Sequence, residues 1–146
     1  MAVDVLTEIE IARPRTDVAT YAGDIDNTTA WYENIKEVEW KSTRPLVVGS
    51  RIAFVAEFLG RRLAYTYEVT EIVPGERLVM RTSEGLFPME TTYTWSDAPG
   101  ATRMTLRNRG EPAGFKRIAA PLLAQAMRRA NEKDLRRLKQ ILERRA

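Results

Sequence analysis

Aromatic side chains with a polar tip recur at every second position in two segments of the chain. Tyr65 and Tyr67 form one such pair, and Tyr93 and Trp95 form another. Because alternate residues of a β-strand point to the same face, each pair is expected to present its tips on one side. In an apolar cavity, phenol and indole groups can orient a ligand's oxygen atoms, and a phenol can donate a proton to an enolate or a leaving hydroxyl. The competing interpretation is that these side chains fill the core, with their tips bonded to water or backbone.

The chain contains no cysteine and no histidine. Disulfides, thiolate nucleophiles, imidazole bases and cysteine-based zinc sites are therefore excluded. Carboxylates such as Glu57, Glu68 and Glu90 fall opposite the apolar side of their strands, so no inward pair of acids is expected. Arg81 and Arg107 would reach the interior only where a bulge reverses the strand. The sequence thus predicts no metal site and no cofactor, the catalytic residues stay unknown, and whether the protein is an enzyme stays open.

The elements that must position the aromatic pairs follow from hydrophobic periodicity. Alternation of apolar and polar residues predicts seven strands joined mostly by short turns, so the sheet should be antiparallel. The first strand places Val3 and Val5 on one side and Asp4 and Glu8 on the other, which is typical of a sheet with one face in water. The strands are expected at residues 3–12, 35–41, 51–58, 62–70, 78–83, 87–95 and 103–109.

Helical spacing occurs on both sides of the strand-rich region. Residues 14–32 predict two short helices, separated at Gly23. Residues 115–143 repeat apolar side chains at i, i+3 and i+4 positions, which predicts a long amphipathic helix. Pro121 should kink this helix or start it afresh, and Asp134 interrupts its apolar stripe. From Pro121 onward the helix would be about 34 Å long, enough to lie across the sheet.

The order of these elements predicts an α+β fold in one domain, residues 1–146. The long C-terminal helix should pack over the concave face of a curved, seven-stranded antiparallel sheet, because both surfaces are apolar. One helix does not fill such a concavity, so a cavity with apolar and aromatic walls is expected, with Phe87 at its lip and Trp31 in one wall. Simple core packing is the alternative for each residue. The predicted ligand-binding residues are Trp31, Phe54, Phe58, Tyr65, Tyr67, Met80, Phe87, Met89, Tyr93, Trp95, Met104, Asn108, Leu123 and Met127.

Several segments, taken together in their order, match one known pattern. They are residues 9–14 (Ile-Glu-Ile-Ala-Arg-Pro), Asp24 and Trp31 in the short helices, Gly49, residues 69–78 and the closing helix. Over essentially its whole length the chain resembles the helix-grip superfamily of START-like and Bet v 1-like domains (SRPBCC), and within it the polyketide cyclase/dehydrase-type branch. The resemblance implies a hydrophobic cavity between sheet and helix. It implies no single activity, because the superfamily includes lipid and hormone binders, quinone-binding proteins, co-chaperone domains and aromatase/cyclases.

Three functions are compatible with these features. The first is binding of a small hydrophobic ligand, whether aromatic, polyketide-like or lipid-like, in the cavity. The second is a cyclase/aromatase-type enzyme with Tyr65, Tyr67 or Tyr93 as proton donor. The third is an interaction module that docks through its basic C-terminal helix, because residues 128–146 contain eight Lys and Arg but three Asp and Glu. A solvated helix face explains the same charges.

The partner expected from the sequence is a small hydrophobic molecule. No secretory signal and no apolar run of roughly 20 residues is present, so we expect a soluble, cytoplasmic protein without stable membrane insertion. Nucleic acid is not expected as a partner, because the inferred aromatic residues point away from the basic helix. The sequence leaves a homodimer open.

Overall fold

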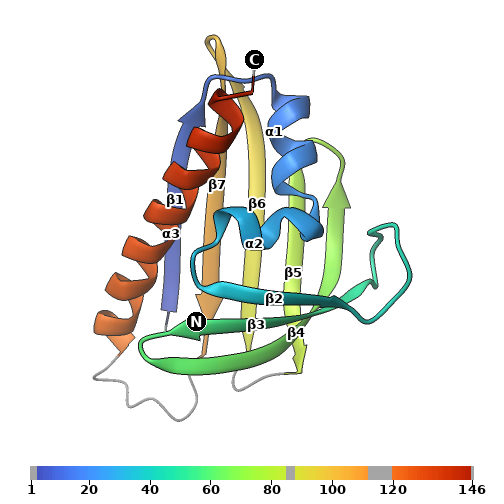
Figure 1. Ribbon diagram of the computed structural model, residues 1–146, viewed down its shortest axis with the longest axis vertical. Helices are drawn as coiled ribbons and strands as arrows, with labels where there is room; N and C mark the ends of the chain where they lie inside the picture. Colours follow the sequence, from blue (N-terminus) through green and yellow to red (C-terminus); the bar gives the residue numbers. More distant parts are fainter. Residues whose placement is uncertain (1–2, 85–87, 112–119, 146) are drawn as a thin grey trace.

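The computed structural model describes residues 3–84, 88–111 and 120–145 (Figure 1). Its helical elements are α1 (Arg15–Ala22), the 3-10 helix η1 (Ile25–Asn27), α2 (Thr28–Trp31) and α3 (Ala120–Glu143). Its strands are β1 (Val3–Ile11), β2 (Ile35–Trp40), β3 (Arg51–Phe58), β4 (Arg61–Val73), β5 (Arg77–Glu84), β6 (Met89–Ala98) and β7 (Ala101–Gly110).

The seven strands form one antiparallel sheet in the order β1-β7-β6-β5-β4-β3-β2. With the short helices after β1 and the long helix at the end, this confirms the predicted helix-grip fold. In Figure 1, β2 and β3 run across the direction of β1, β5, β6 and β7. The pairing of β4 with β5 shifts register between Thr66 and Tyr67 and again between Val69 and Glu71. Such irregularities bend a strand, so β4 can turn between the two parts of the sheet.

Four strands are longer than the periodicity predicted, and β4 and β7 gain the most residues. β4 continues to Val73, which pairs with Arg77, and β7 begins at Ala101, which pairs with Ala98. Both additions lie beside tight turns, where hydrogen-bonded pairing persists after the apolar alternation has ended. A strand predicted from alternation ends at its last alternating residue, so the predicted strand is shorter than the real one beside a turn.

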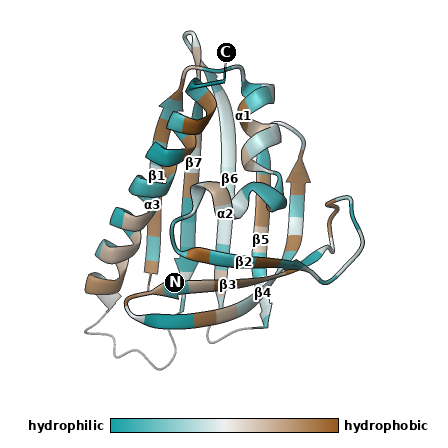
Figure 2. Cartoon of the chain, in the orientation of Figure 1, coloured by the Kyte–Doolittle hydropathy of each residue, from teal (hydrophilic) through white to brown (hydrophobic). Residues whose placement is uncertain are grey.

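Helix α3 packs its apolar stripe on the sheet, beside β1 (Figure 1). Leu135, Leu138 and Leu142 are buried in the main core, and Figure 2 shows hydrophobic and hydrophilic residues alternating along the helix. Pro121 is the second residue of α3 as described, and its predicted effect on the helix, a kink or a fresh start, stays a prediction. Residues 115–119 of the predicted helix lie outside the described residues. Among the described helices, none is both long and apolar enough to cross a membrane.

The short helices close one end of the sheet. Asp24 accepts a hydrogen bond from the Asp26 backbone N–H at 3.0 Å, which caps η1 after the break at Gly23. A Cβ at Gly23 would lie 2.7 Å from the Ala19 carbonyl oxygen and 3.5 Å from the Trp95 ring. The tight contact is therefore with the backbone of the last turn of α1, whereas the Trp95 ring of β6 lies at an ordinary packing distance.

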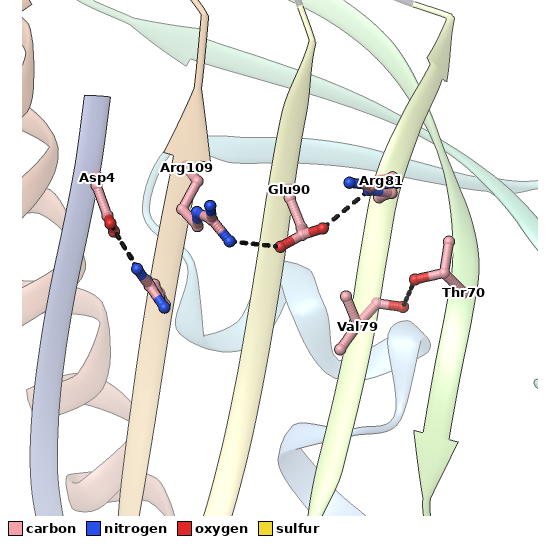
Figure 3. A network of polar contacts seen from close by, with 7 residues as sticks. Asp4, Thr70, Val79, Arg81, Glu90 and Arg109 are labelled. Carbon is pink, nitrogen blue, oxygen red and sulfur yellow. Dashed lines mark hydrogen bonds and ion pairs between the residues drawn. The ribbon is translucent and has the colours of Figure 1, made fainter. Parts of the chain in front are cut away.

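Charged residues occupy the outer face of the sheet, as the alternation predicted. Glu90 accepts a hydrogen bond from Arg81 Nε at 2.8 Å and pairs with Arg109, while Arg107 binds Asp4 from the neighbouring strand (Figure 3). Arg81 and Arg107 therefore stay outside the cavity, and no bulge turns them inward. The outer face is a solvated surface joined across strands by ion pairs.

Candidate functional site

A cavity of about 140 Å³ lies between the sheet, the η1–α2 segment and α3. Its walls are mostly apolar, with a few polar groups at separate places. The sheet contributes Ile35, Phe54, Ala56, Phe58, Leu63, Tyr65, Tyr67, Met80, Met89, Thr91, Tyr93 and Asn108. The helical side contributes Ile25, Thr28, Tyr32, Asn34, Leu123, Met127, Ala130, Asn131 and Asp134. Apolar walls with few polar groups are typical of sites for small molecules.

Ten residues that the sequence singled out for ligand contact line this cavity together. They are Phe54, Phe58, Tyr65, Tyr67, Met80, Met89, Tyr93, Asn108, Leu123 and Met127. Alternation along β3 to β7 brings the strand residues to one face, and the i, i+4 spacing of Leu123 and Met127 aligns the two helix residues opposite them. Phe87 lies outside the described residues, so its place at the lip stays a prediction.

Three further predicted residues, Trp31, Trp95 and Met104, point inward but do not line the cavity. The Trp31 ring is fully buried, with its centroid 4.2 Å from that of Tyr32 and 5.8 Å from that of Tyr93. Trp95 and Met104 are buried in the same cluster. The physical reason is that α1, α2 and the C-terminal part of α3 pack against this end of the sheet. The inward side chains there are buried in the core and do not border the cavity.

A chain of hydrogen bonds runs along the sheet floor of the cavity. Thr91 Oγ1 donates to Asn108 Oδ1 at 2.7 Å, so the Tyr67 hydroxyl, also 2.7 Å from Thr91 Oγ1, is the donor in that pair. Burial raises the pKa of Tyr67 to about 12, against a smaller opposing effect of its bond to Thr91. Tyr67 is therefore a neutral hydrogen-bonding group at ordinary pH and a weak proton donor.

A second pair of hydroxyls lies nearer the helices. The Tyr32 and Tyr93 hydroxyl oxygens are 2.7 Å apart and bond one another. Burial raises the pKa of Tyr32, Tyr65 and Tyr93 above the usual value for a phenol. These phenols stay protonated over the whole physiological range, and none is activated to give up its proton.

Two polar residues of α3, Asn131 and Asp134, complete the lining and were missed as site residues. They are 5% and 3% exposed, and their spacing of three residues places them on one helix face. The available signal was the interruption of the apolar stripe at Asp134, because a carboxylate at a core-facing position is rare unless it has a partner or a role.

The Asp134 carboxyl is buried without an ion pair of its own among the described residues. Its Oδ1 accepts a hydrogen bond from the Glu33 backbone N–H at 3.0 Å, and Lys133 pairs with the Glu33 side chain at 2.8 Å. Burial raises the pKa of Asp134 to about 6, although the bond from Glu33 opposes this shift. Asp134 is thus the one cavity carboxyl in the described part of the chain, and it titrates close to neutral pH.

The described residues hold no group of three or more Asp, Glu, His or Cys side chains that could bind a metal ion. The site can therefore act through apolar contact, neutral hydroxyls, three amides and one titratable carboxyl.

Comparison with known proteins decides the family. Residues 2–143 match the family model described as polyketide cyclase / dehydrase and lipid transport. The chain belongs to this family. The resemblance to START-like helix-grip domains is thereby confirmed over nearly the whole chain, whereas a search of curated proteins finds no match.

Several solved structures superpose closely on this chain. TTHA0849 from Thermus thermophilus is 21% identical with a TM-score of 0.83, covering 95% of this chain and 96% of its own. A START superfamily protein from Mycobacterium smegmatis is 14% identical with a TM-score of 0.80, covering 98% and 99%. The Zhui aromatase/cyclase from a Streptomyces species is 16% identical with a TM-score of 0.80, covering 97% and 94%. At these identities the likeness shows a shared fold.

Proposed function

We propose that this protein binds a small hydrophobic molecule, with at least one ring, in the cavity between the sheet and α3. The observation that carries the proposal is the cavity itself, whose walls are apolar and aromatic side chains from strands and helix. Cavities of about 150 Å³ lined by Leu, Ile and Phe stay dry and accept benzene, so the size suits one ring. The gain comes from apolar area removed from water, at about 25 cal/mol per Å².

The methionines extend the range of ligands that this cavity suits. Met80, Met89 and Met127 line it from two strands and the helix. Unbranched thioether side chains change rotamer at low cost and adapt to irregular shapes. A ligand larger than one ring, of the polyketide-like or lipid-like kind that the family description names, would be accommodated by their movement.

The test is titration of the protein with toluene by isothermal calorimetry, beside a variant in which the cavity is filled. Ala56 lines the cavity from β3, so Ala56→Phe should occupy the space and abolish binding. Ala53→Phe adds the same ring to the same strand but on the opposite, outer side, so it should bind toluene like the wild type. Equal binding by both variants, or none by the wild type, would refute the proposal.

A cyclase-type reaction is the second candidate, and Asp134 is the observation that favours it. A buried carboxyl with a pKa of about 6 beside a ring-sized cavity suits general acid–base work near neutral pH. The tyrosines favour it less, because their raised pKa values make them weaker acids. Turnover of a poly-β-ketone substrate that is lost in Asp134→Asn and kept in Tyr67→Phe would support this candidate; absence of turnover in the wild type would dismiss it.

The docking alternative is weakened by how the basic residues of α3 are used. Arg128 donates to the Leu6 carbonyl, Arg137 to the Ala30 carbonyl and Lys139 to the Glu10 carbonyl, at 2.6 to 2.9 Å. These cations hold the helix on β1 and α2. Part of the positive charge of α3 therefore stabilises the fold and is not needed for binding a partner. This favours the cavity over the helix surface as the functional site.

A further inference from the structure

Asn131 and Asp134 lie on the cavity side of α3 with hydrogen-bonding capacity left over. Among the described residues, the buried Asn131 amide nitrogen has no hydrogen-bond partner. The Asp134 carboxyl receives one bond, from the Glu33 backbone N–H, although two carboxylate oxygens offer about four acceptor positions. Buried polar groups without partners are costly, and native proteins keep few of them. A group that enters the cavity can supply the missing bonds.

The charges around Asp134 offset its negative charge only in part. Two cations on its own helix affect it: Lys133 pairs with Glu33 at 2.8 Å, and Arg137 donates to the Ala30 carbonyl at 2.8 Å. Glu33, from the segment after α2, adds a like charge nearby.

From the sheet and the end of α2, two phenols interact with the same carboxyl. The hydroxyls of Tyr32 and Tyr93 bond each other, 2.7 Å apart, and both feel the charge of Asp134. Above a pH of about 6, Asp134 is therefore an anion in an apolar cavity without a dedicated cation among the described residues.

We propose that Asn131 and Asp134 make the cavity select neutral, hydroxyl-donating rings such as phenols and enols, and reject ligands whose head group is a carboxylate. This inference rests on the proposed function, because it assigns the chemistry of the ligand in the same cavity. The ring occupies the apolar part between the strands and Met127, and its hydroxyl donates to Asp134. A carbonyl beside the hydroxyl would accept from the Asn131 amide.

The physical basis is the difference between two interactions of one buried carboxylate. A hydrogen bond that it accepts from a neutral hydroxyl contributes about 1.5–3 kcal/mol, which corresponds to roughly 10- to 100-fold in affinity. A ligand carboxylate at the same place meets like-charge repulsion in a medium that screens charge poorly. The phenol should therefore bind more tightly than an unsubstituted ring of equal size, and the carboxylate more weakly.

The experiment compares three ligands that share one ring: toluene, 4-methylphenol and 4-methylbenzoate. Calorimetric titration at pH 7.5 should give the order of affinity 4-methylphenol, toluene, 4-methylbenzoate, with about tenfold or more between the first and the last. At pH 5.5, where most Asp134 is protonated, the gap between 4-methylphenol and 4-methylbenzoate should narrow.

Asp134→Asn removes the charge and keeps an oxygen that can accept from the Glu33 N–H, so the fold should persist. This variant should lose most of the discrimination against 4-methylbenzoate and most of its pH dependence. Glu132→Gln is the matched control, because Glu132 is an exposed acid on the same helix; it should behave as the wild type.

The outcomes separate this inference from the proposed function. If no ligand, toluene included, binds the wild type, the proposed function itself fails. If toluene binds and the ratio between 4-methylphenol and 4-methylbenzoate is the same in wild type and Asp134→Asn, the cavity stands and the selection by Asp134 is refuted. A ratio that falls in Asp134→Asn and not in Glu132→Gln establishes it.

Discussion

Asp134 is the side chain in which stability and function compete most directly. Its carboxyl is 3% exposed. Its pKa of about 6, against 3.8 for a free aspartate, means that the folded protein holds the proton more tightly than the unfolded chain does. Ionisation at neutral pH therefore costs free energy of folding, a cost that the surroundings only partly offset through the Glu33 N–H. Groups that are kept charged and buried at such a cost are frequently found at sites where a ligand or substrate is handled.

This cost has a definite pH dependence. Because the pKa is about 6 in the folded state and near 3.8 in the unfolded chain, the native state binds more protons between these values, so Asp134 lowers stability as pH rises from about 4 to 6. The loss is roughly 2–3 kcal/mol and is complete above pH 7. Asp134→Asn should thus be more stable than the wild type at pH 7.5 and lose that advantage near pH 4, measured by urea unfolding. The same advantage in Glu132→Gln would contradict this account.

The helices and strands position the site through a few close contacts. Helix α1 packs against β6 at Gly23, where an added Cβ would lie 3.5 Å from the Trp95 ring and 2.7 Å from the Ala19 carbonyl oxygen of α1 itself. This approach makes one end of the sheet solid, with Trp31 and Trp95 as core. The cavity lies farther along, where the sheet faces the first turns of α3. The packing of one short helix therefore decides which inward aromatic residues become core and which line the cavity.

Substitution of Gly23 tests this arrangement. Gly23→Ala places a methyl group 2.7 Å from the Ala19 carbonyl oxygen of the same helix, so the last turn of α1 must distort, at a cost of about 1–3 kcal/mol in unfolding free energy. Thr20→Ala, at an exposed position of α1, should change stability by less than about 0.5 kcal/mol. Thermal or urea unfolding of both variants measures the difference, and equal stabilities would show that the close approach is not maintained in solution.

The whole molecule couples ligand binding to folding, because sheet and α3 enclose the cavity from opposite sides. A ligand that requires both sides binds the native state and not the unfolded chain, so it stabilises the fold by mass action. The cation contacts of Arg128 and Lys139 with backbone carbonyls of β1 hold the two sides together before any ligand enters. Binding should therefore be visible in global unfolding.

The expected effect is a rise in the unfolding temperature with toluene concentration. At a free concentration of 100 times Kd the stabilisation is about 2.7 kcal/mol, or roughly 5–10 °C for a domain of this size. Differential scanning calorimetry of wild type, Ala53→Phe and Ala56→Phe should show the rise in the first two proteins only. A rise in Ala56→Phe as well would mean that toluene acts somewhere other than the cavity.

Much of the fold and part of the site followed from periodicity. Alternation along the strands identified the single sheet and eight of the twelve strand side chains that line the cavity, because a strand residue's face is fixed by its parity. The same parity rule could not tell Met80, at the cavity, from Met104, in the core. Both point inward, and the difference depends on which helix lies opposite, which no local pattern contains.

The amino-acid order alone determined the element order, the inward and outward faces, and the absence of thiol and imidazole chemistry, because these depend on residue type and local spacing. Only the folded chain decided that Asn131 and Asp134 meet the cavity between phenols from α2 and β6. That meeting joins residues some 40 to 100 positions apart in the chain. Burial of the carboxyl, and hence its pKa, arises from the bend of the sheet and the path of α3 across it, and is therefore a property of the tertiary structure.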